Sequence, residues 1–365
     1  MAKKPYGSGY FGEWIEDEFG LPAYRYTCNQ INDPKAITPL YETWRLKTDQ
    51  LHEVGNDRLV GVASNYGYIQ VRQDEGSPKY LNDYNPERHQ FAGGFGYLTD
   101  GKEVISTFYS GQSDSFDRIF GMGYYRKKVT GKGLVANQVV FAPFGDDPLL
   151  ISQVTIVNQR QESVNLRWIE YWGCQMYQFS YKSFMLSLAS KSKSTSDIRR
   201  SFSERFKQKF SLIEGGAGLV ATKRFTGLKI SQKVAWTGLQ LYLSQKGKDL
   251  TGGKVKSPVR EAVLEDLNPP PTFLVSLDAP VDGWTTNGAQ FFGKGGVESP
   301  EGLQNPLSSD LTPSGTAGGM FLERKLHLDP GEQQTIYFAY GYIPEGLELK
   351  SLLAKYQEKL PNLLS

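Results

Sequence analysis

The chain has 365 residues, enough for one large domain or two ordinary ones, and its 39 glycines and 13% aromatic residues favour strands and tight turns over helical bundles. Lys and Arg number 41 against 39 Asp and Glu. This balance indicates no polyanionic partner, so nucleic acid is a disfavoured ligand.

The two cysteines, Cys28 and Cys174, are too few for a disulfide scaffold and lack the C-x-x-C spacing of zinc or redox sites. The first residues, MAKKPYGSGYFGEW, contain no apolar core of a signal peptide. No run of about 18 apolar residues, the length of a membrane span, occurs in the chain. We therefore expect a cytoplasmic protein without a membrane partner.

Aromatic and acidic residues crowd together in the amino-terminal segment 10–27, where Gly20 and Pro22 bend the chain. We expect residues 1–45 to form an irregular aromatic segment. Such a segment can plug the end of a β-sandwich, which is the interpretation we favour. Alternatively, its rings and carboxylates can contact a sugar, because ring faces hold pyranose rings and carboxylates hold hydroxyl groups.

Two hairpins are predicted in the next hundred residues. The runs 59–63 and 68–71 flank a turn at 64–67, and the runs 95–98 and 104–108 flank Asp100-Gly101, a strong hairpin turn. Glycines at 93, 94 and 96 lack the Lys-Ser/Thr of a phosphate-binding loop and precede a strand, so they indicate a bend or bulge in a sheet.

The stretch 149–178 has the clearest strand pattern of the chain. Apolar residues alternate in the runs 150–156 and 164–172, which are separated by six polar residues at 158–163. This spacing predicts two neighbouring antiparallel strands. Glu170 interrupts the apolar side of the second run, so it either has a polar partner inside the sheet, which we favour because Trp and Tyr donors are abundant, or faces a polar ligand on a concave face.

Helical patterns occur in two places. Apolar residues recur every four positions over 198–210, which predicts an amphipathic helix after a Ser- and Lys-rich loop at 183–196. A second apolar stripe predicts a helix over 347–360. About fifteen strand candidates and no alternating βα pattern favour a single, mainly all-β domain, a large antiparallel β-super-sandwich with a few short helices.

The three histidines, His52, His89 and His327, have no second ligand at metal-binding spacing, so we expect no metal and no cofactor. His327 lies in a late strand and is interpreted as structural. His52 with Glu53, and His89 beside Glu87 and Arg88, are the local pairs that could act as acid and base, although a surface loop is the simpler interpretation. No nucleophile elbow occurs.

Several segments recur in the order seen in glycoside hydrolase family 94, a family of disaccharide and oligosaccharide phosphorylases and their relatives. They are HEVGNDRLVGVASNYGYIQV, HQFAGGFGYLTDGKEVISTFY, VTIVNQRQESVNLRWIEYWG, FFGKGGVESPEGL and LDPGEQQTIYFAYGY. The chain resembles the amino-terminal β-super-sandwich of that family, which is galactose mutarotase-like. The resemblance implies a sandwich over 1–345 and a linker-like carboxy-terminal helix over 346–365.

In that family the catalytic acid lies in a following (α/α)6 barrel, for which 365 residues leave no room. The resemblance therefore implies a non-catalytic module that shapes a glycan site or assembles with such a barrel, the assembly being a glycoside phosphorylase or hydrolase. Its implied partners are a β-linked glucan oligosaccharide, the barrel and a second copy in a homodimer. We expect contacts with a glycan or partner at Trp14, Tyr24, Arg25, Tyr26, Phe91, Phe95 and Glu170.

The alternative is a sugar-active enzyme that works alone, similar to an aldose epimerase or a glycosidase. It would use histidine and glutamate on the concave face of the sandwich, with His52, His89 and Glu170 as catalytic candidates. Mutarotase-like enzymes rely on histidines well inside strands, and His327 alone has such a position in the sequence. This weakens the alternative.

Overall fold

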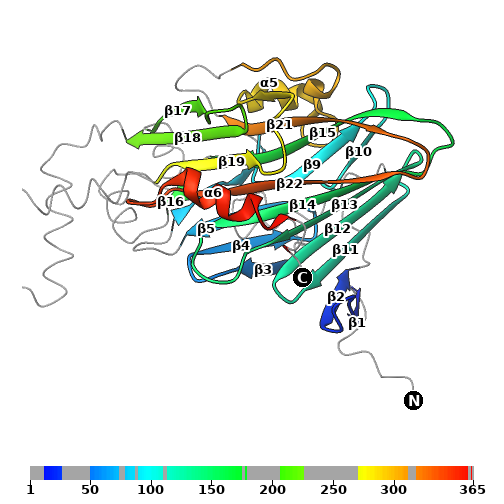
Figure 1. The fold of residues 1–365 in the computed structure, drawn as a ribbon, viewed down its shortest axis with the longest axis horizontal. Helices are drawn as coiled ribbons and strands as arrows, with labels where there is room; N and C mark the ends of the chain where they lie inside the picture. Colours follow the sequence, from blue (N-terminus) through cyan, green and yellow to red (C-terminus); the bar gives the residue numbers. More distant parts are fainter. Residues whose placement is uncertain are drawn as a thin grey trace, which may run out of the picture.

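The computed structural model describes residues 12–26, 50–73, 79–86, 89–109, 113–174, 177–178, 206–225, 270–310, 318–360 and 363. Antiparallel strands dominate this part of the chain (Figure 1). They form one large sheet packed against smaller sheets, so the predicted antiparallel β-super-sandwich is confirmed. No helix within the described residues is both long and apolar enough to cross a membrane.

The largest sheet has ten strands and collects segments from both ends of the chain. Hydrogen bonds join its strands in the order β1 (Gly12–Glu16), β2 (Pro22–Tyr26), β11 (Ser115–Gly121), β12 (Tyr124–Gly131), β13 (Leu134–Phe141), β14 (Leu149–Asn158), β22 (Gln333–Tyr342), β19 (Thr272–Ser276), β18 (Gly218–Phe225) and β17 (Phe206–Leu212).

Two five-stranded sheets lie against one face of the large sheet. The first runs in the order β10 (Val104–Ser106), β9 (Gly93–Thr99), β15 (Val164–Gly173), β21 (Gly319–Leu328) and β20 (Gly283–Thr285). The second runs in the order β16 (Tyr177–Gln178), β6 (Lys79–Tyr80), β5 (Ile69–Gln73), β4 (Leu59–Ser64) and β3 (Leu51–Gly55). A short pair, β7 (Tyr84–Asn85) and β8 (Gln90–Phe91), completes the described strands.

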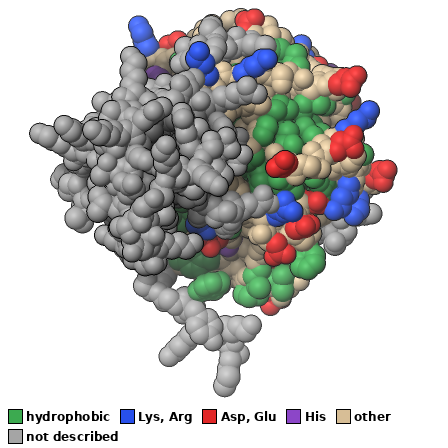
Figure 2. All heavy atoms as spheres, turned by 90° about the vertical axis from the view of Figure 1, so that its left-hand side faces the viewer, with side chains coloured by type: hydrophobic (Ala, Val, Ile, Leu, Met, Phe, Trp, Pro, Cys, Tyr) green, Lys and Arg blue, Asp and Glu red, His purple; other side chains and the backbone are tan. Residues whose placement is uncertain are grey.

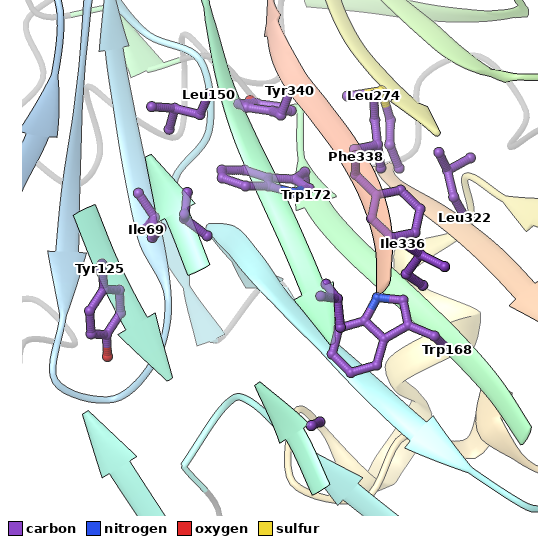
Figure 3. Close-up of a cluster of buried hydrophobic side chains, with 14 of the residues drawn as sticks. Ile69, Tyr125, Leu150, Trp168, Trp172, Leu274, Leu322, Ile336, Phe338 and Tyr340 are labelled. Carbon is purple, nitrogen blue, oxygen red and sulfur yellow. The ribbon is translucent and has the colours of Figure 1, made fainter. Parts of the chain in front are cut away.

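The main core fills the space between the ten-stranded sheet and the two smaller ones. Trp168 and Trp172 of β15 are fully buried there, and Trp172 stacks on Tyr340 of β22 with ring centroids 4.3 Å apart (Figure 3). Alternate residues of each strand enter this layer, as the pleat of a strand requires. Burial of these large side chains is therefore the main force that holds the sheets together.

Helices cover the outer faces of two sheets. The short helices α5 (Gly288–Phe292), η5 (Gly293–Gly295) and η6 (Glu301–Leu303) bring Phe291 and Phe292 onto the outer face of the β9–β15–β21 sheet. Helix α6 (Leu349–Gln357) lies on the outer face of the ten-stranded sheet, in front of β22 in Figure 1. The carboxy-terminal helix is thus present, two or three residues shorter at each end than predicted.

Both predicted hairpins are confirmed. Strands β4 and β5 pair from Leu59↔Gln73 to Ala63↔Ile69, and β9 pairs with β10 around Asp100-Gly101. The glycine-rich bend is also confirmed, because the register between β9 and β15 shifts between Tyr171 and Trp172, opposite Gly93. The predicted strand at 235–244 and the Ser- and Lys-rich loop at 183–196 lie outside the described residues.

The prediction that 150–156 and 164–172 are neighbouring strands is wrong. Strand β14 pairs with β13 and β22 in the ten-stranded sheet, whereas β15 pairs with β9 and β21 in the smaller sheet. The polar loop at 158–163 therefore crosses from one layer to the other. Alternation shows that each run is a strand with one buried side. Two strands of the same sheet and two strands that face each other from packed sheets both have this pattern, so alternation does not identify the pairing partner.

Two further predictions are corrected. Residues Phe206–Leu212 form strand β17, which pairs with β18, where the four-residue period predicted a helix; residues 198–205 lie outside the described part. Residues 12–26, predicted to be irregular, form the hairpin β1–β2 at the edge of the ten-stranded sheet. In both cases pairing with neighbouring strands of the sheet, β18 for residues 206–212 and β11 for β2, outweighs the local pattern.

Candidate functional site

A pocket of about 340 Å³ opens at one end of the sandwich, where the β1–β2 hairpin, the beginning of β3 and the β11–β12 turn meet. Its walls come from segments about a hundred residues apart in the chain. The lining consists mostly of aromatic and apolar residues with a few neutral polar ones: Trp14, Pro22, Tyr24, Tyr26, Gln50, Leu51, His52, Phe120, Gly121, Met122 and Gly123.

The hairpin register places three aromatic rings on the pocket side. Trp14 pairs with Tyr24, and Gly12 pairs with Tyr26, so Trp14, Tyr24 and Tyr26 share one face. The rings of Trp14 and Tyr24 meet edge to face with centroids 5.4 Å apart, while Trp14 remains 50% exposed. The hairpin therefore holds an indole ring in place and still presents it to solvent.

Arg25 lies between these residues in sequence but on the opposite face of the hairpin. Its guanidinium is 3.3 Å from a carboxylate oxygen of Asp117 and 3.8 Å from one of Glu13. It does not line the pocket. The structure thus brings together Trp14, Tyr24 and Tyr26 from the predicted set and separates Arg25 from them.

His52 forms part of the pocket wall. Its Nε2 lies 2.9 Å from the carbonyl oxygen of Gly121, and because a carbonyl only accepts, Nε2 carries the proton. The imidazole stacks on Phe120 with centroids 5.2 Å apart. Burial lowers the pKa of His52, and hydrogen bonds to the backbone of Gly121 and Tyr124 only partly offset this. The ring is therefore neutral at neutral pH, with its second nitrogen an acceptor.

Glu53, the neighbour of His52, does not complete an acid and base pair in the pocket. Successive residues of a strand point to opposite faces, and Glu53 is exposed on the other face of β3. Among the described residues that line the pocket, there is no carboxylate and no cationic side chain. The pocket can therefore bind a neutral ligand through ring faces and hydrogen bonds, but its own lining supplies no carboxylic acid for proton transfer.

Glu170 lies elsewhere, fully buried in the core between the sheets. It accepts hydrogen bonds from the indole N–H groups of Trp168 and Trp172, at 2.9 and 3.0 Å, and from the amide of Gln138, at 3.1 and 3.2 Å. The hydroxyl of Ser152 also bonds to it. These contacts favour the structural interpretation of Glu170, with the Trp donors that the sequence suggested.

A buried cation accompanies this carboxylate. Lys127 of β12 is fully buried, and its Nζ donates hydrogen bonds to the carbonyl groups of Gly67, at 2.8 Å, and Gly94. Burial lowers the pKa of Lys127, and burial raises the pKa of Glu170; each charge partly offsets the shift of the other. The two groups form a polar centre within the core rather than a surface site.

Phe91 and Phe95 are buried in a second aromatic core, between the β9–β15–β21 sheet and helix α5. Phe91 packs on Phe292 with centroids 4.6 Å apart, and Phe95 packs on Tyr171 at 5.1 Å. Neither residue lines the pocket. The expectation that they contact a glycan is therefore not supported by their positions.

The other two histidines also lie outside the pocket. His327 is exposed on β21, where its Nδ1 is 2.8 Å from Oδ1 of Asn165. His89 adopts a positive φ of 53° in the turn before β8, and its predicted partners Glu87 and Arg88 lie outside the described residues. Among the described residues, no cluster of three or more His, Cys, Asp or Glu side chains could hold a metal ion.

The sequence reasoning missed the second wall of the pocket, formed by Phe120, Gly121, Met122 and Gly123 together with Gln50. One signal was available. Met122 stands between two glycines in a turn that joins two strands, and it is 62% exposed. A large apolar side chain at a turn indicates a binding or interaction site when it lies beside other exposed apolar residues.

Comparison with known proteins finds one family model that matches part of the chain. Residues 258–359 match the sequence model of the glycosyl hydrolase 94 supersandwich domain. No curated protein matches the chain. Among solved structures, the chain is similar to a polysaccharide lyase, with 10% identity, a TM-score of 0.38 and coverage of 84% of this chain and 34% of the lyase.

Two further solved structures are similar to the chain. A protein described as a kojibiose phosphorylase from the human microbiome has 8% identity and a TM-score of 0.45, with 98% of this chain and 37% of that protein covered. A protein described as an aldose 1-epimerase from Escherichia coli K12 has 7% identity and a TM-score of 0.33, with coverage of 81% and 100%. The chain spans about a third of the length of the lyase and the phosphorylase. The family match bears out the resemblance seen in the sequence over residues 258–359, which are similar to the supersandwich domain of glycosyl hydrolase family 94.

Proposed function

We propose that this chain is a carbohydrate-active β-sandwich module that is not catalytic by itself and acts with an (α/α)6 catalytic barrel. The assembly would be a glycoside phosphorylase or glycoside hydrolase acting on a β-linked glucan oligosaccharide. The supersandwich match over residues 258–359 supports the carbohydrate class. The observation that carries the proposal is that the described residues of the pocket offer aromatic rings and neutral polar groups but no carboxylate.

Glycoside hydrolysis usually requires two carboxyl groups about 5 to 10 Å apart on either side of the scissile bond. The part of the pocket lining that the structure describes supplies no carboxyl group. Glu170, the carboxylate considered for an enzyme that works alone, is enclosed by its donors and has no exposed surface. The alternative of a sandwich enzyme using His52 with Glu170 is therefore the weaker of the two.

Exposed apolar side chains at the same end of the sandwich support an assembly with a second domain. The turns that follow β1, β11 and β13 lie side by side there, because their strands are adjacent or paired in the sheet. They expose Phe19, Leu21, Met122 and Phe144. Contiguous exposed apolar surface commonly marks an interaction site.

Charge is mixed on the one described face that Figure 2 shows. In Figure 2, acidic and basic side chains are interspersed around hydrophobic ones on the face in view. Such a surface supports docking of a protein domain more than attraction of a polyanion.

The test is an assay of the purified chain for phosphorolysis, hydrolysis and anomer conversion of cellobiose and longer β-linked glucans. We expect no turnover by the chain alone, because no acid and base are assembled in the pocket. Turnover that is abolished by His52→Ala, His89→Ala or Glu170→Gln would overturn the proposal in favour of a sandwich enzyme. A chain variant with Phe144→Ala serves as the matched control, since this exposed aromatic residue lies outside the pocket.

A further inference from the structure

We propose that the pocket between the β1–β2 hairpin and β3 binds a single neutral sugar ring, with the apolar face of the ring against Trp14 and its hydroxyl groups directed to His52 and Gln50. This inference rests on the proposed function and adds a location and a ligand class to it. It depends on four features of the pocket, namely its aromatic platform, its polar groups, its charge and its size.

The platform is the indole ring of Trp14. It is fixed by pairing of Trp14 with Tyr24 and by the edge-to-face contact of their rings, so little side-chain entropy is lost when a ligand binds. Half of Trp14 is nevertheless exposed. A pyranose presents C–H groups on one face and hydroxyl groups around its edge, which matches an aromatic surface with polar groups at its border.

Polar groups border this platform. His52 is oriented by its hydrogen bond to Gly121 and its stacking on Phe120, which leaves an acceptor nitrogen on a neutral ring. Gln50 is held through its backbone, because its N–H donates to Oδ1 of Asn65 at 2.8 Å and its carbonyl accepts from the N–H of Asn65 at 3.0 Å. An amide and an imidazole together offer both donors and acceptors, as sugar hydroxyls require.

The charges near the pocket favour a neutral ligand. None of the lining residues within the described ranges is charged. Glu13 and Arg25 lie on the opposite face of the hairpin, where they face each other at 3.8 Å. Arg118 lies beneath Tyr26 with no exposed surface, 4.6 Å from the ring centroid, and donates to the carbonyl of Asn65. No charged group on the pocket wall would therefore pair with an ionic ligand.

The volume limits the size of the ligand. About 340 Å³ lies at the small end of the range of ligand pockets, roughly 300 to 1,000 Å³. This volume suits one ring, or the terminal ring of a longer glycan that extends into solvent.

Fluorine NMR of protein labelled with 5-fluorotryptophan tests the inference directly. The chain has six tryptophans, and Trp14→Phe identifies the resonance of Trp14. We expect methyl β-D-glucopyranoside and cellobiose to shift this resonance in a saturable way. Resonances of Trp168 and Trp172, which are fully buried, should not move. No shift of the Trp14 resonance at about 100 mM of either sugar, a concentration that detects even weak millimolar affinity, overturns the inference.

Substitutions test which residues contact the sugar. We expect Trp14→Ala to weaken binding by about tenfold and Trp14→Tyr, which keeps an aromatic face, to retain most of the affinity. His52→Ala should weaken it by about fivefold, the loss expected for one hydrogen bond. Phe144→Ala, an exposed ring outside the pocket, should have no effect. Equal affinities of the Trp14→Ala and Phe144→Ala variants would contradict a site at Trp14.

The charge of the ligand gives a third criterion. Glucuronic acid should bind no more tightly than methyl β-D-glucopyranoside; tighter binding of the acid overturns the assignment of a neutral ligand.

The sugar-binding inference and the proposed function can be refuted separately. Sugar binding with a silent Trp14 resonance refutes this pocket but leaves the module intact, whereas turnover by the chain alone refutes the module.

Discussion

At the scale of single residues, Glu170 and Lys127 show how charge is accommodated inside an apolar core. Glu170 sits between Trp168 and Trp172 on one side of β15, and both indole N–H groups donate to it. Lys127 donates to the backbone carbonyl groups of Gly67, in a turn, and of Gly94, in strand β9. Buried ionisable groups are tolerated only when their hydrogen bonds are satisfied, so these contacts link separate strands and loops of the fold.

We expect Glu170→Ala to lower the free energy of unfolding by about 3 to 5 kcal/mol, because the two indole donors and the amide of Gln138 lose their common acceptor. Glu170→Gln should cost less, since one carbonyl oxygen remains. Guanidinium unfolding of each variant measures the change. His327→Ala, at an exposed position, should differ from wild type by no more than about 0.5 kcal/mol. If Glu170→Ala is as stable as His327→Ala, the role of Glu170 as a common hydrogen-bond acceptor is contradicted.

The stability of the protein should also depend on pH through Glu170. Burial raises the pKa of Glu170 from 4.5 to about 7. Between these values the unfolded chain has lost this proton while the folded protein retains it, so the free energy of unfolding decreases as pH rises through this window. Unfolding curves at pH 5, 6 and 7 should show this slope in wild type. The free energy of unfolding should depend less steeply on pH in Glu170→Gln. The same pH dependence in the two proteins would refute the raised pKa of Glu170.

At the scale of elements, helix α6 is attached to the sandwich by both apolar and polar contacts. Leu352, Leu353 and Tyr356 are buried against the outer face of the ten-stranded sheet. The carboxylate of Asp147, in the turn before β14, accepts hydrogen bonds from Lys355, at 2.5 Å, and from the hydroxyl of Tyr356. Burial of Asp147 opposes its ionisation, but these hydrogen bonds and the charge of Lys355 lower its pKa.

Asp147→Ala should therefore destabilise the protein by about 2 kcal/mol, the loss expected for hydrogen bonds to a charged group. Its neighbour Asp146 provides a matched control. The Asp146 side chain is 74% exposed and lies 3.9 Å from Arg58, a contact of the kind that contributes little. Asp146→Ala should change the free energy of unfolding by no more than about 0.5 kcal/mol. Similar losses for the two variants in urea unfolding would show that Asp147 does not anchor the helix.

At the scale of the whole molecule, one core connects all three large sheets. The same buried cluster contains Ile69 of the β3–β4–β5 sheet, Trp168 of the β9–β15–β21 sheet, and Leu150 and Ile336 of the ten-stranded sheet. These strands come from distant parts of the chain. Neither of the smaller sheets has a separate interface with the large one, so we propose that the described residues unfold as a single domain.

Thermal or denaturant unfolding should accordingly give one cooperative transition. Far-ultraviolet circular dichroism reports the strands, and tryptophan fluorescence reports the core around Trp168 and Trp172. The two signals should have the same midpoint, as in two-state unfolding. Midpoints that differ reproducibly between the two probes would show that the sheets are independent units.

Local sequence patterns identify several of the strands, some of their turns and the final helix. Alternation over 150–156 and 164–172 indicates buried strand faces, Asp100-Gly101 indicates a hairpin, and the apolar stripe over 347–360 indicates the final helix. These features depend on residues close together in the chain. Local geometry sets side-chain parity and turn conformation, so the sequence pattern is sufficient for them.

The pairing of the strands and the exposure of the aromatic residues depend on contacts that exist only in the folded protein. Strands β14 and β15 face each other from different sheets, and Phe95 is buried whereas Trp14 is exposed. Trp14 and Met122, which are more than a hundred residues apart in sequence, line one pocket together with His52. The period of a strand does not specify its partner, because pairing and burial are set by contacts between distant segments. The pocket exists only because the edges of two sheets converge at one end of the sandwich.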